Sequence, residues 1–413
     1  MAYEPATPSV RRHAGDSCPV RRNPVTGRLR VALPESPGGR YSPAMPGWLV
    51  RVALAILLVP LPMPVQGQPS DPQALALAEA LATYRGGELR GALQRLGTIP
   101  QEKLNDTVFR FCLRDDLPPR LRIVRMRIST ALLTEMAIER TRHQVGAWSD
   151  PYFAAARALV RRLSRMVDDG RDGAGEAEGR FARDWYLLVV SFRHGRSEAG
   201  WSRAYLAEAR ELFPKDPQVL LVSGSDHEMV SHVSAGYLRR FSASGQGASD
   251  SRINPEKELE EAEKYFKQAA ALAPDLVEAR LRLGRVLMRR GDLDGAASEL
   301  RSALEHTAQD PARYDQVRYL AWMFLGLVDV DRGNLESAER SYVEALRLFP
   351  NAQAIKVAMS EVAYLKGRDA DAAAQVVSML ESFARQDPWW TYLLGDAWHF
   401  EARLVDLRAQ ALR

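Results

Sequence analysis

Cysteine is scarce in this chain. Of 413 residues only two are cysteine, Cys18 and Cys112, and Cys18 lies in an N-terminal segment that we expect to be removed. The remaining single thiol excludes an internal disulfide and a cysteine-based metal site. Cys112 follows the apolar and aromatic residues Val108, Phe109 and Phe111, so we expect a buried structural thiol rather than a reactive one.

Period-two alternation of apolar and polar residues is also missing. Almost every segment after residue 67 instead places apolar residues at helical spacing. We therefore predict an all-α fold.

Recognisable catalytic and cofactor motifs are absent as well. His227, Glu228 and His232 resemble a zinc-protease helix, but that motif needs histidines four residues apart, and a spacing of five turns the second imidazole away. The glycines near residues 168–180 fit neither a dinucleotide loop nor a calcium loop. We expect a protein that is not an enzyme and binds no metal or cofactor. The alternative is a helical hydrolase or metal enzyme with an unrecognised site.

The chain has no global excess of one charge outside its N-terminus. Its net charge is +4, but residues 1–67 carry eight arginines and three acidic residues, so residues 68–413 have a net charge of −1. Such a body does not favour nucleic-acid binding.

The longest apolar run is short. Residues 48–59 are apolar apart from Arg51, and a proline-rich exit leads to small residues ending at Gly67. This pattern is typical of a signal peptide, whereas a membrane span needs about 20 apolar residues. We expect export to the periplasm or beyond, with cleavage after Gly67, residues 1–44 dispensable and a start at Met45 left open. The alternative is an uncleaved leader that anchors the protein in the inner membrane.

One motif is present and recurs. It comprises a bulky residue, a Leu-Gly pair, a turn glycine, a small residue with an aromatic four positions later, and a closing proline: Trp322, Leu325, Gly326, Gly333, Ala338, Tyr342 and Pro350. The small residue recurs at intervals of 34, 42 and 34, at Ala262, Ala296, Ala338 and Ala372. Eight extra residues, 307–314, fall in a turn, where an insertion is tolerated.

This pattern resembles the tetratricopeptide repeat (TPR), a helical hairpin that stacks into a solenoid. We predict a leader over residues 1–67, an N-terminal helical region over 68–170, degenerate repeat-like helices with an insertion over 180–254, and repeats over 255–384. One continuous helix over residues 387–413 is expected to cap the open end of the solenoid.

The resemblance implies that a protein or peptide binds along the concave side, at the second, fifth, ninth and twelfth positions of each first helix. The expected partner-binding residues are Arg285, Met288, Met323, Glu361, Tyr364, Trp389 and Tyr392. Trp389 is expected to face the groove with Tyr392, while Trp390 packs on the preceding repeat. The alternative is that the N-terminal helices cover this face.

These observations favour an exported bacterial TPR protein that acts as an interaction scaffold of the cell envelope. A membrane-anchored adaptor of a secretion or pilus assembly machine is the alternative. The sequence does not identify the partner or the oligomeric state.

Overall fold

The structure is a computed structural model. It describes residues 71–141, 150–196, 198–244, 254–381, 387–393, 395 and 399–413, with the backbone alone for 199 and 233–244. The predicted leader, residues 1–67, lies outside the described residues. All described helices belong to one unit, Gly67–Arg413.

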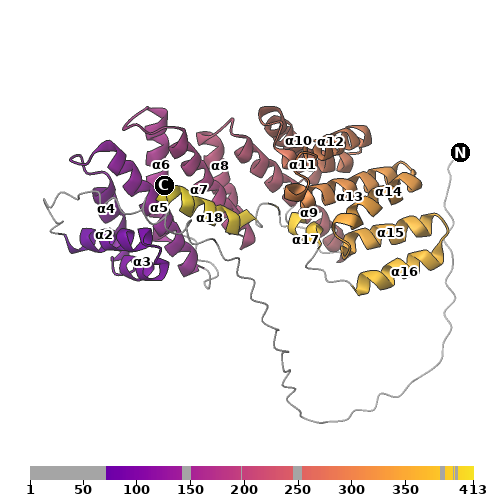
Figure 1. Cartoon of the computed structure of the whole chain (residues 1–413), viewed down its shortest axis with the longest axis horizontal. Helices are drawn as coiled ribbons and strands as arrows, with labels where there is room; N and C mark the ends of the chain where they lie inside the picture. The colour runs from indigo at the N-terminus through magenta and orange to yellow at the C-terminus, as the bar shows by residue number, and fades with distance from the viewer. Residues whose placement is uncertain are drawn as a thin grey trace, which may run out of the picture. The chain divides into compact units, whose positions relative to one another are not determined.

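Every regular element in these residues is helical, as predicted (Figure 1). The first helices are α2 (Pro72–Arg85), α3 (Leu89–Leu96), α4 (Gln101–Cys112), α5 (Pro119–Thr141), α6 (Pro151–Asp168), α7 (Glu176–Gly195), α8 (Ala199–Leu212) and α9 (Pro217–Ser244). They are followed by α10 (Pro255–Leu272), α11 (Val277–Arg289), α12 (Leu293–His306), the short 3₁₀ helix η1 (Ala312–Tyr314), α13 (Asp315–Asp331), α14 (Leu335–Leu348), α15 (Gln353–Leu365), α16 (Asp369–Leu380), α17 (Pro388–Leu393) and α18 (Phe400–Leu412). None of them is long and apolar enough to cross a membrane, a statement that covers the described residues only.

The repeat is built from antiparallel hairpins. The pairs α11–α12, α13–α14 and α15–α16 pack together as predicted, and the inserted turn after α12 contains η1. Helices α9 and α10 form a further hairpin. The stack of hairpins therefore begins with α9, before residue 255, where the sequence predicts the first repeat to start.

A close helix crossing is present in three of these hairpins and explains why the spacing of small and bulky residues recurs within the chain. A glycine on the first helix lies against a bulky side chain on the second, and a Cβ at the glycine would clash with it. The pairs are Gly224–Phe266, Gly284–Leu300 and Gly326–Tyr342, with Cβ-to-carbon distances of 2.5, 2.7 and 2.2 Å.

The N-terminal helices form a second apolar core that continues from α2 into the start of α9. Helix α7 begins at Glu176, four residues before the predicted region, because the Glu178 carboxylate accepts a hydrogen bond from the Gly175 N–H at 3.0 Å. Cys112 is buried in this core, as predicted, and its thiol lies 3.3 Å from the Ser129 hydroxyl. Burial raises the pKa of that thiol to about 12.

The C-terminal segment differs from the expected single helix. It divides into α17 and α18, and Gly395 between them has a φ of +58°, which interrupts a right-handed helix. Helix α17 packs against α13, whereas α18 packs against α5 and α7. The apolar side of α18, which includes Leu404 and Leu407, therefore covers the N-terminal core and not the last repeat.

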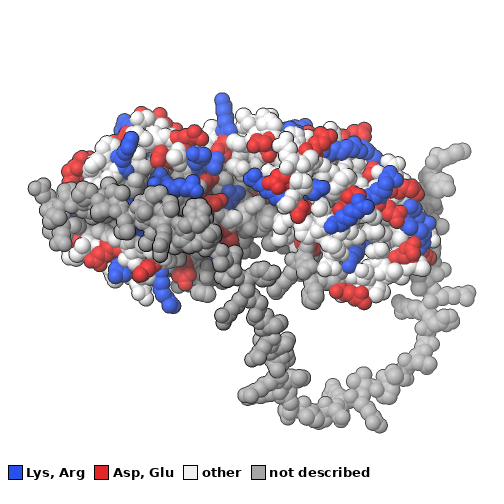
Figure 2. All heavy atoms as spheres, in the orientation of Figure 1, with Lys and Arg blue, Asp and Glu red and all other residues white. Residues whose placement is uncertain are grey.

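Acidic and basic side chains are mixed on the face of the repeats drawn in Figure 2. Many of them pair across neighbouring helices, for example Arg290 with Glu256 at 3.1 Å and Lys366 with Glu339 at 3.0 Å. This mixture agrees with the near-neutral charge of residues 68–413.

Candidate functional site

The concave positions of the first two repeats are largely buried. Leu281, Arg285, Leu320 and Met323 are each between 1% and 6% exposed. They lie on α11 and α13, so another element covers this part of the predicted binding face.

That element includes α17 of the same chain. The rings of Trp389 and Tyr392 stack with centroids 5.8 Å apart, which places them on one face of α17. Both pack edge-on against Phe324 of α13, at 6.0 and 5.5 Å. The Arg285 guanidinium lies 4.9 Å from each of these two rings. A short C-terminal helix thus occupies part of the concave face.

A buried carboxylate from α9 closes the same region from another side. Glu228 is 2% exposed and accepts hydrogen bonds from Arg285 at 2.7 Å, Arg282 at 3.0 Å and the Tyr392 hydroxyl at 2.7 Å. Burial alone raises the pKa of Glu228, but the charges of Arg285 and Arg282 outweigh burial and hold this pKa below its usual value. The carboxylate therefore joins three helices, α9, α11 and α17.

A second carboxylate, Asp387, fixes the start of α17. Its Oδ1 accepts from the Tyr319 hydroxyl at 2.8 Å and from the Trp389 N–H at 2.9 Å, and its Oδ2 accepts from the Ala354 N–H at 2.7 Å. Asp387 is 2% exposed and so satisfies donors on α13, α15 and α17 at once. This arrangement anchors α17 to the repeats.

The two tryptophans of α17 differ from their expected roles. Trp390, which the sequence predicts to pack on the preceding repeat, is 52% exposed, and Trp389 is the one that packs on the repeats, against Phe324 of α13. Trp389 shares a helix face with Tyr392, which lies three residues later. Tyr392 donates a hydrogen bond to Glu228 and its ring contacts the Arg285 guanidinium, so this face is buried against the repeats.

The remaining predicted residues lie in more open surroundings. Tyr364 is 68% exposed and Glu361 is exposed, both on α15, and Met288 at the end of α11 is half-buried. Val357, on the same face of α15, is 51% exposed. The structure therefore separates the seven predicted residues into a largely buried group around α17, an open pair on α15, and the half-buried Met288 on α11.

A cavity of about 430 Å³ remains in the concave face between α11 and the start of α13. Glu278, Leu281 and Leu320 line one side of it, and Tyr392 and His399 line the other. It has the size of a small-ligand or side-chain pocket.

The residues of the protease-like motif have structural partners. His227 Nδ1 lies 2.7 Å from the Glu258 carboxylate and its ring stacks on Tyr265, while Glu228 faces the arginines. Within the described part of the chain, no group of three or more histidine, cysteine or acidic side chains could hold a metal ion.

Sequence reasoning missed Glu228 as a partner of the concave arginines, and it missed Arg282 and Asp387 altogether. Arg282 is 2% exposed although it lies outside the expected binding positions. A usable signal was the pair Arg282 and Arg285, because residues three apart lie on one side of a helix and arginines that become buried there need carboxylate partners.

Comparison with known proteins agrees with the repeat geometry. Two tetratricopeptide repeat family models match residues 256–318 and 324–388. Among solved structures, pilF of Pseudomonas aeruginosa is 17% identical, with 55% of this chain and 88% of that chain covered and a TM-score of 0.36. MamA from Desulfovibrio magneticus RS-1 is 18% identical, covering 48% and 93%, with a TM-score of 0.35. No curated protein matches the chain. The hairpin packing and the two family models identify tetratricopeptide repeats over residues 256–388 of this chain, and such repeats support a role as a protein-interaction scaffold.

Proposed function

We propose that this protein is a non-enzymatic scaffold that binds a protein or peptide partner on the concave face of its repeats. The observation that carries the proposal is the exposure of large side chains at concave positions of α15. Tyr364 is 68% exposed and Val357 is 51% exposed, with the Glu361 carboxylate between them along the helix. Tyrosine is enriched among the residues that dominate the binding energy of protein interfaces.

The seven predicted residues then have two roles. Glu361 and Tyr364 contact the partner directly, and the half-buried Met288 and Trp389 border the site. The buried members support the surface and hold α17 in place; they are Arg285, Met323 and Tyr392.

A photo-crosslinking amino acid at position 364 tests this function in living cells. We expect it to capture a discrete protein partner, and we expect Tyr364→Ala combined with Glu361→Ala to reduce capture from a neighbouring position such as 357. The matched control places the same crosslinker at Arg347 on α14, whose side chain is 68% exposed. Equal capture of the same protein from positions 364 and 347 would rule out the concave face.

We also propose that the partner is met outside the cytoplasm, in the cell envelope, and the support for this is the signal-like pattern of residues 45–67. Two aspartates within residues 52–59 should retain the protein in the cytoplasm, and unchanged fractionation would refute export. Sequencing of the mature N-terminus distinguishes a cleaved leader from an anchored adaptor.

A further inference from the structure

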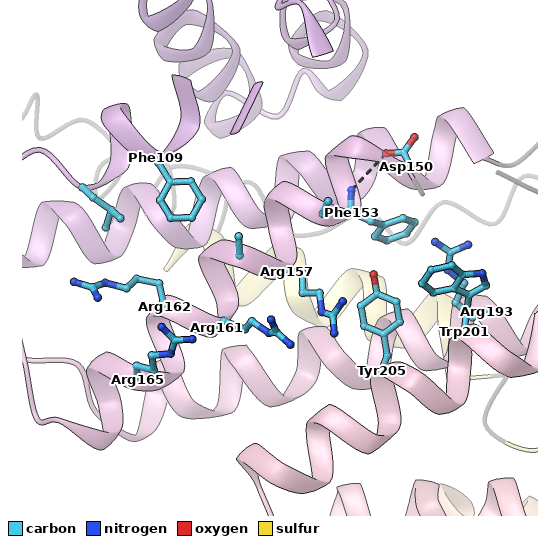
Figure 3. Close-up of a pocket in the computed structure, with 13 residues that line it drawn as sticks. Phe109, Asp150, Phe153, Arg157, Arg161, Arg162, Arg165, Arg193, Trp201 and Tyr205 are labelled. Carbon is cyan, nitrogen blue, oxygen red and sulfur yellow. Dashed lines mark hydrogen bonds between the residues drawn. The ribbon is translucent and has the colours of Figure 1, made fainter. Parts of the chain in front are cut away.

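A second hollow lies outside the repeats, on helices α4, α6, α7 and α8. It is a cavity of about 650 Å³, within the size range of ligand sites. Its wall contains five arginines, namely Arg157, Arg161, Arg162, Arg165 and Arg193. Figure 3 shows Arg165, Arg161 and Arg157 following one another along α6, which is the arrangement of residues four apart on a helix.

Only part of this positive charge is neutralised by the protein. Arg157 and Arg161 both pair with one carboxylate, Glu208 on α8, and Arg157 Nε donates to it at 2.7 Å. Arg162 and Arg165 are exposed and have no ion pair among the described residues. The guanidinium groups of Arg162 and Arg165 are thus available to a ligand. So is the net positive charge that remains where Arg157 and Arg161 share the single carboxylate of Glu208.

One buried polar group at the same cavity lacks a partner. The Nε of Arg193, a residue 1% exposed, has no hydrogen-bond acceptor among the described residues, although the Nη1 of the same guanidinium pairs with Glu198. Tyr205 is 6% exposed, and in Figure 3 its hydroxyl points into the space between Arg157 and Trp201. An unsatisfied buried donor is costly, so the Arg193 Nε favours an acceptor from outside.

The cavity also has an apolar side. Phe109, Phe153 and Trp201 line it next to the arginines, and the Arg193 guanidinium lies 4.8 Å from the Phe153 ring. A free inorganic anion would use the charges but leave these rings without contacts. A ligand that carries both carboxylates and bulky apolar groups satisfies the whole surface.

We propose that this arginine pocket binds an acidic segment of a partner polypeptide, with carboxylates on Arg162 and Arg165 and an apolar side chain against Trp201. Arg157 and Arg161 both donate hydrogen bonds to the Glu208 carboxylate, so the same wall of the pocket already binds one carboxylate. Nucleic acid is disfavoured, because residues 68–413 have a net charge of −1 and provide no extended positive field. This pocket is separate from the concave face and does not depend on it.

Fluorescence anisotropy of the full chain with a labelled peptide of alternating glutamate and phenylalanine tests the proposal. We expect saturable binding that weakens as salt is added, and much weaker binding of the peptide with glutamine in place of glutamate. The double variant Arg162→Glu with Arg165→Glu should weaken binding about tenfold or more, since each lost charge pair becomes a repulsion. Both side chains are exposed and unpaired, so its melting temperature should match wild type.

The matched control reverses Arg301 and Arg340, which are exposed on α12 and α14 and give the same change in net charge. It should leave the affinity within about twofold of wild type, a difference of about 0.4 kcal/mol. If the two double variants weaken peptide binding equally, net charge alone accounts for the binding and the proposed pocket site is wrong. Equal affinity for the glutamine peptide, or tighter binding of a single-stranded oligonucleotide, would overturn the ligand class. Tyr364→Ala with Glu361→Ala should not change this affinity, which keeps this test independent of the concave-face proposal.

Discussion

Tyr392 on α17 donates a 2.7 Å hydrogen bond to Glu228 on α9, a residue 164 positions earlier in the chain. The two side chains are buried and share the arginines Arg282 and Arg285 as neighbours. This contact ties the C-terminal segment to the concave face.

Glu228→Gln should lower the free energy of unfolding by about 3–5 kcal/mol, because it leaves the buried Arg285 guanidinium without a counter-charge and leaves Arg282 with Glu278 alone. Tyr392→Phe removes one hydrogen bond to a charged group and should cost about 1.5–3 kcal/mol. Urea unfolding followed by circular dichroism measures both changes. Tyr364→Phe, at an exposed tyrosine, is the control and should match wild type. A loss below about 1 kcal/mol for Glu228→Gln would show that the cluster does not stabilise the fold.

The Glu228 cluster also predicts a pH dependence. The folded pKa of Glu228 is depressed, so its stabilising contribution is complete above the unfolded pKa of about 4.3 and is lost as pH falls through the folded value. The difference in unfolding free energy between wild type and Glu228→Gln should therefore shrink when the pH is lowered below about 4. A difference that stays constant from neutral pH down to acid unfolding would contradict this assignment.

Asp387→Ala should loosen α17, because it removes the acceptor for the Tyr319 hydroxyl and for the backbone N–H groups of Trp389 and Ala354. We expect a loss of about 2 kcal/mol and faster hydrogen exchange of the amides in residues 388–393. Asp310→Ala is the control, since Asp310 is exposed in the turn before η1. Unchanged exchange in α17 would mean that other contacts hold it.

Gly326→Ala should destabilise the protein by about 1–3 kcal/mol, because the new Cβ would lie 2.2 Å from the Tyr342 ring. Ala338→Leu overpacks the second helix of the same hairpin and should behave similarly. Gly179→Ala is the matched control, since its nearest neighbour is 3.8 Å away and α7 would gain up to about 1 kcal/mol of helix propensity. Thermal melts that place Gly326→Ala level with Gly179→Ala would refute the close crossing.

Cys112 should resist thiol reagents at pH 8 in the folded protein and react once the protein is unfolded, provided that Cys18 is absent. Its pKa of about 12 is above the unfolded value of about 8.5, so its contribution to stability is complete below pH 8.5 and is lost as pH rises toward 12. Between these values the difference in unfolding free energy between wild type and Cys112→Ala should fall by about 1.4 kcal/mol per pH unit. Identical slopes for both proteins would show that the thiol ionises equally in the two states.

The repeat could be predicted from sequence because its determinants are local. Gly326, Ala338 and Tyr342 lie within a single hairpin, so their spacing reports directly on one helix crossing. The same holds for the inserted turn before α13, which contains η1. The buried thiol of Cys112 also followed from its immediate apolar neighbours.

The candidate site depended on contacts between distant parts of the chain. Residues 387–413 have helical periodicity throughout, and only the packing of Tyr392 on Glu228 and of Leu404 on the N-terminal core shows that they divide at Gly395 and take separate places. The places of Trp389 and Trp390 follow from that packing. The arginine pocket likewise draws Phe109, Arg162 and Trp201 from three helices. The periodicity of a sequence predicts which residues share a face of a helix. Which other element packs against that face depends on how charge and apolar area are buried in the folded chain.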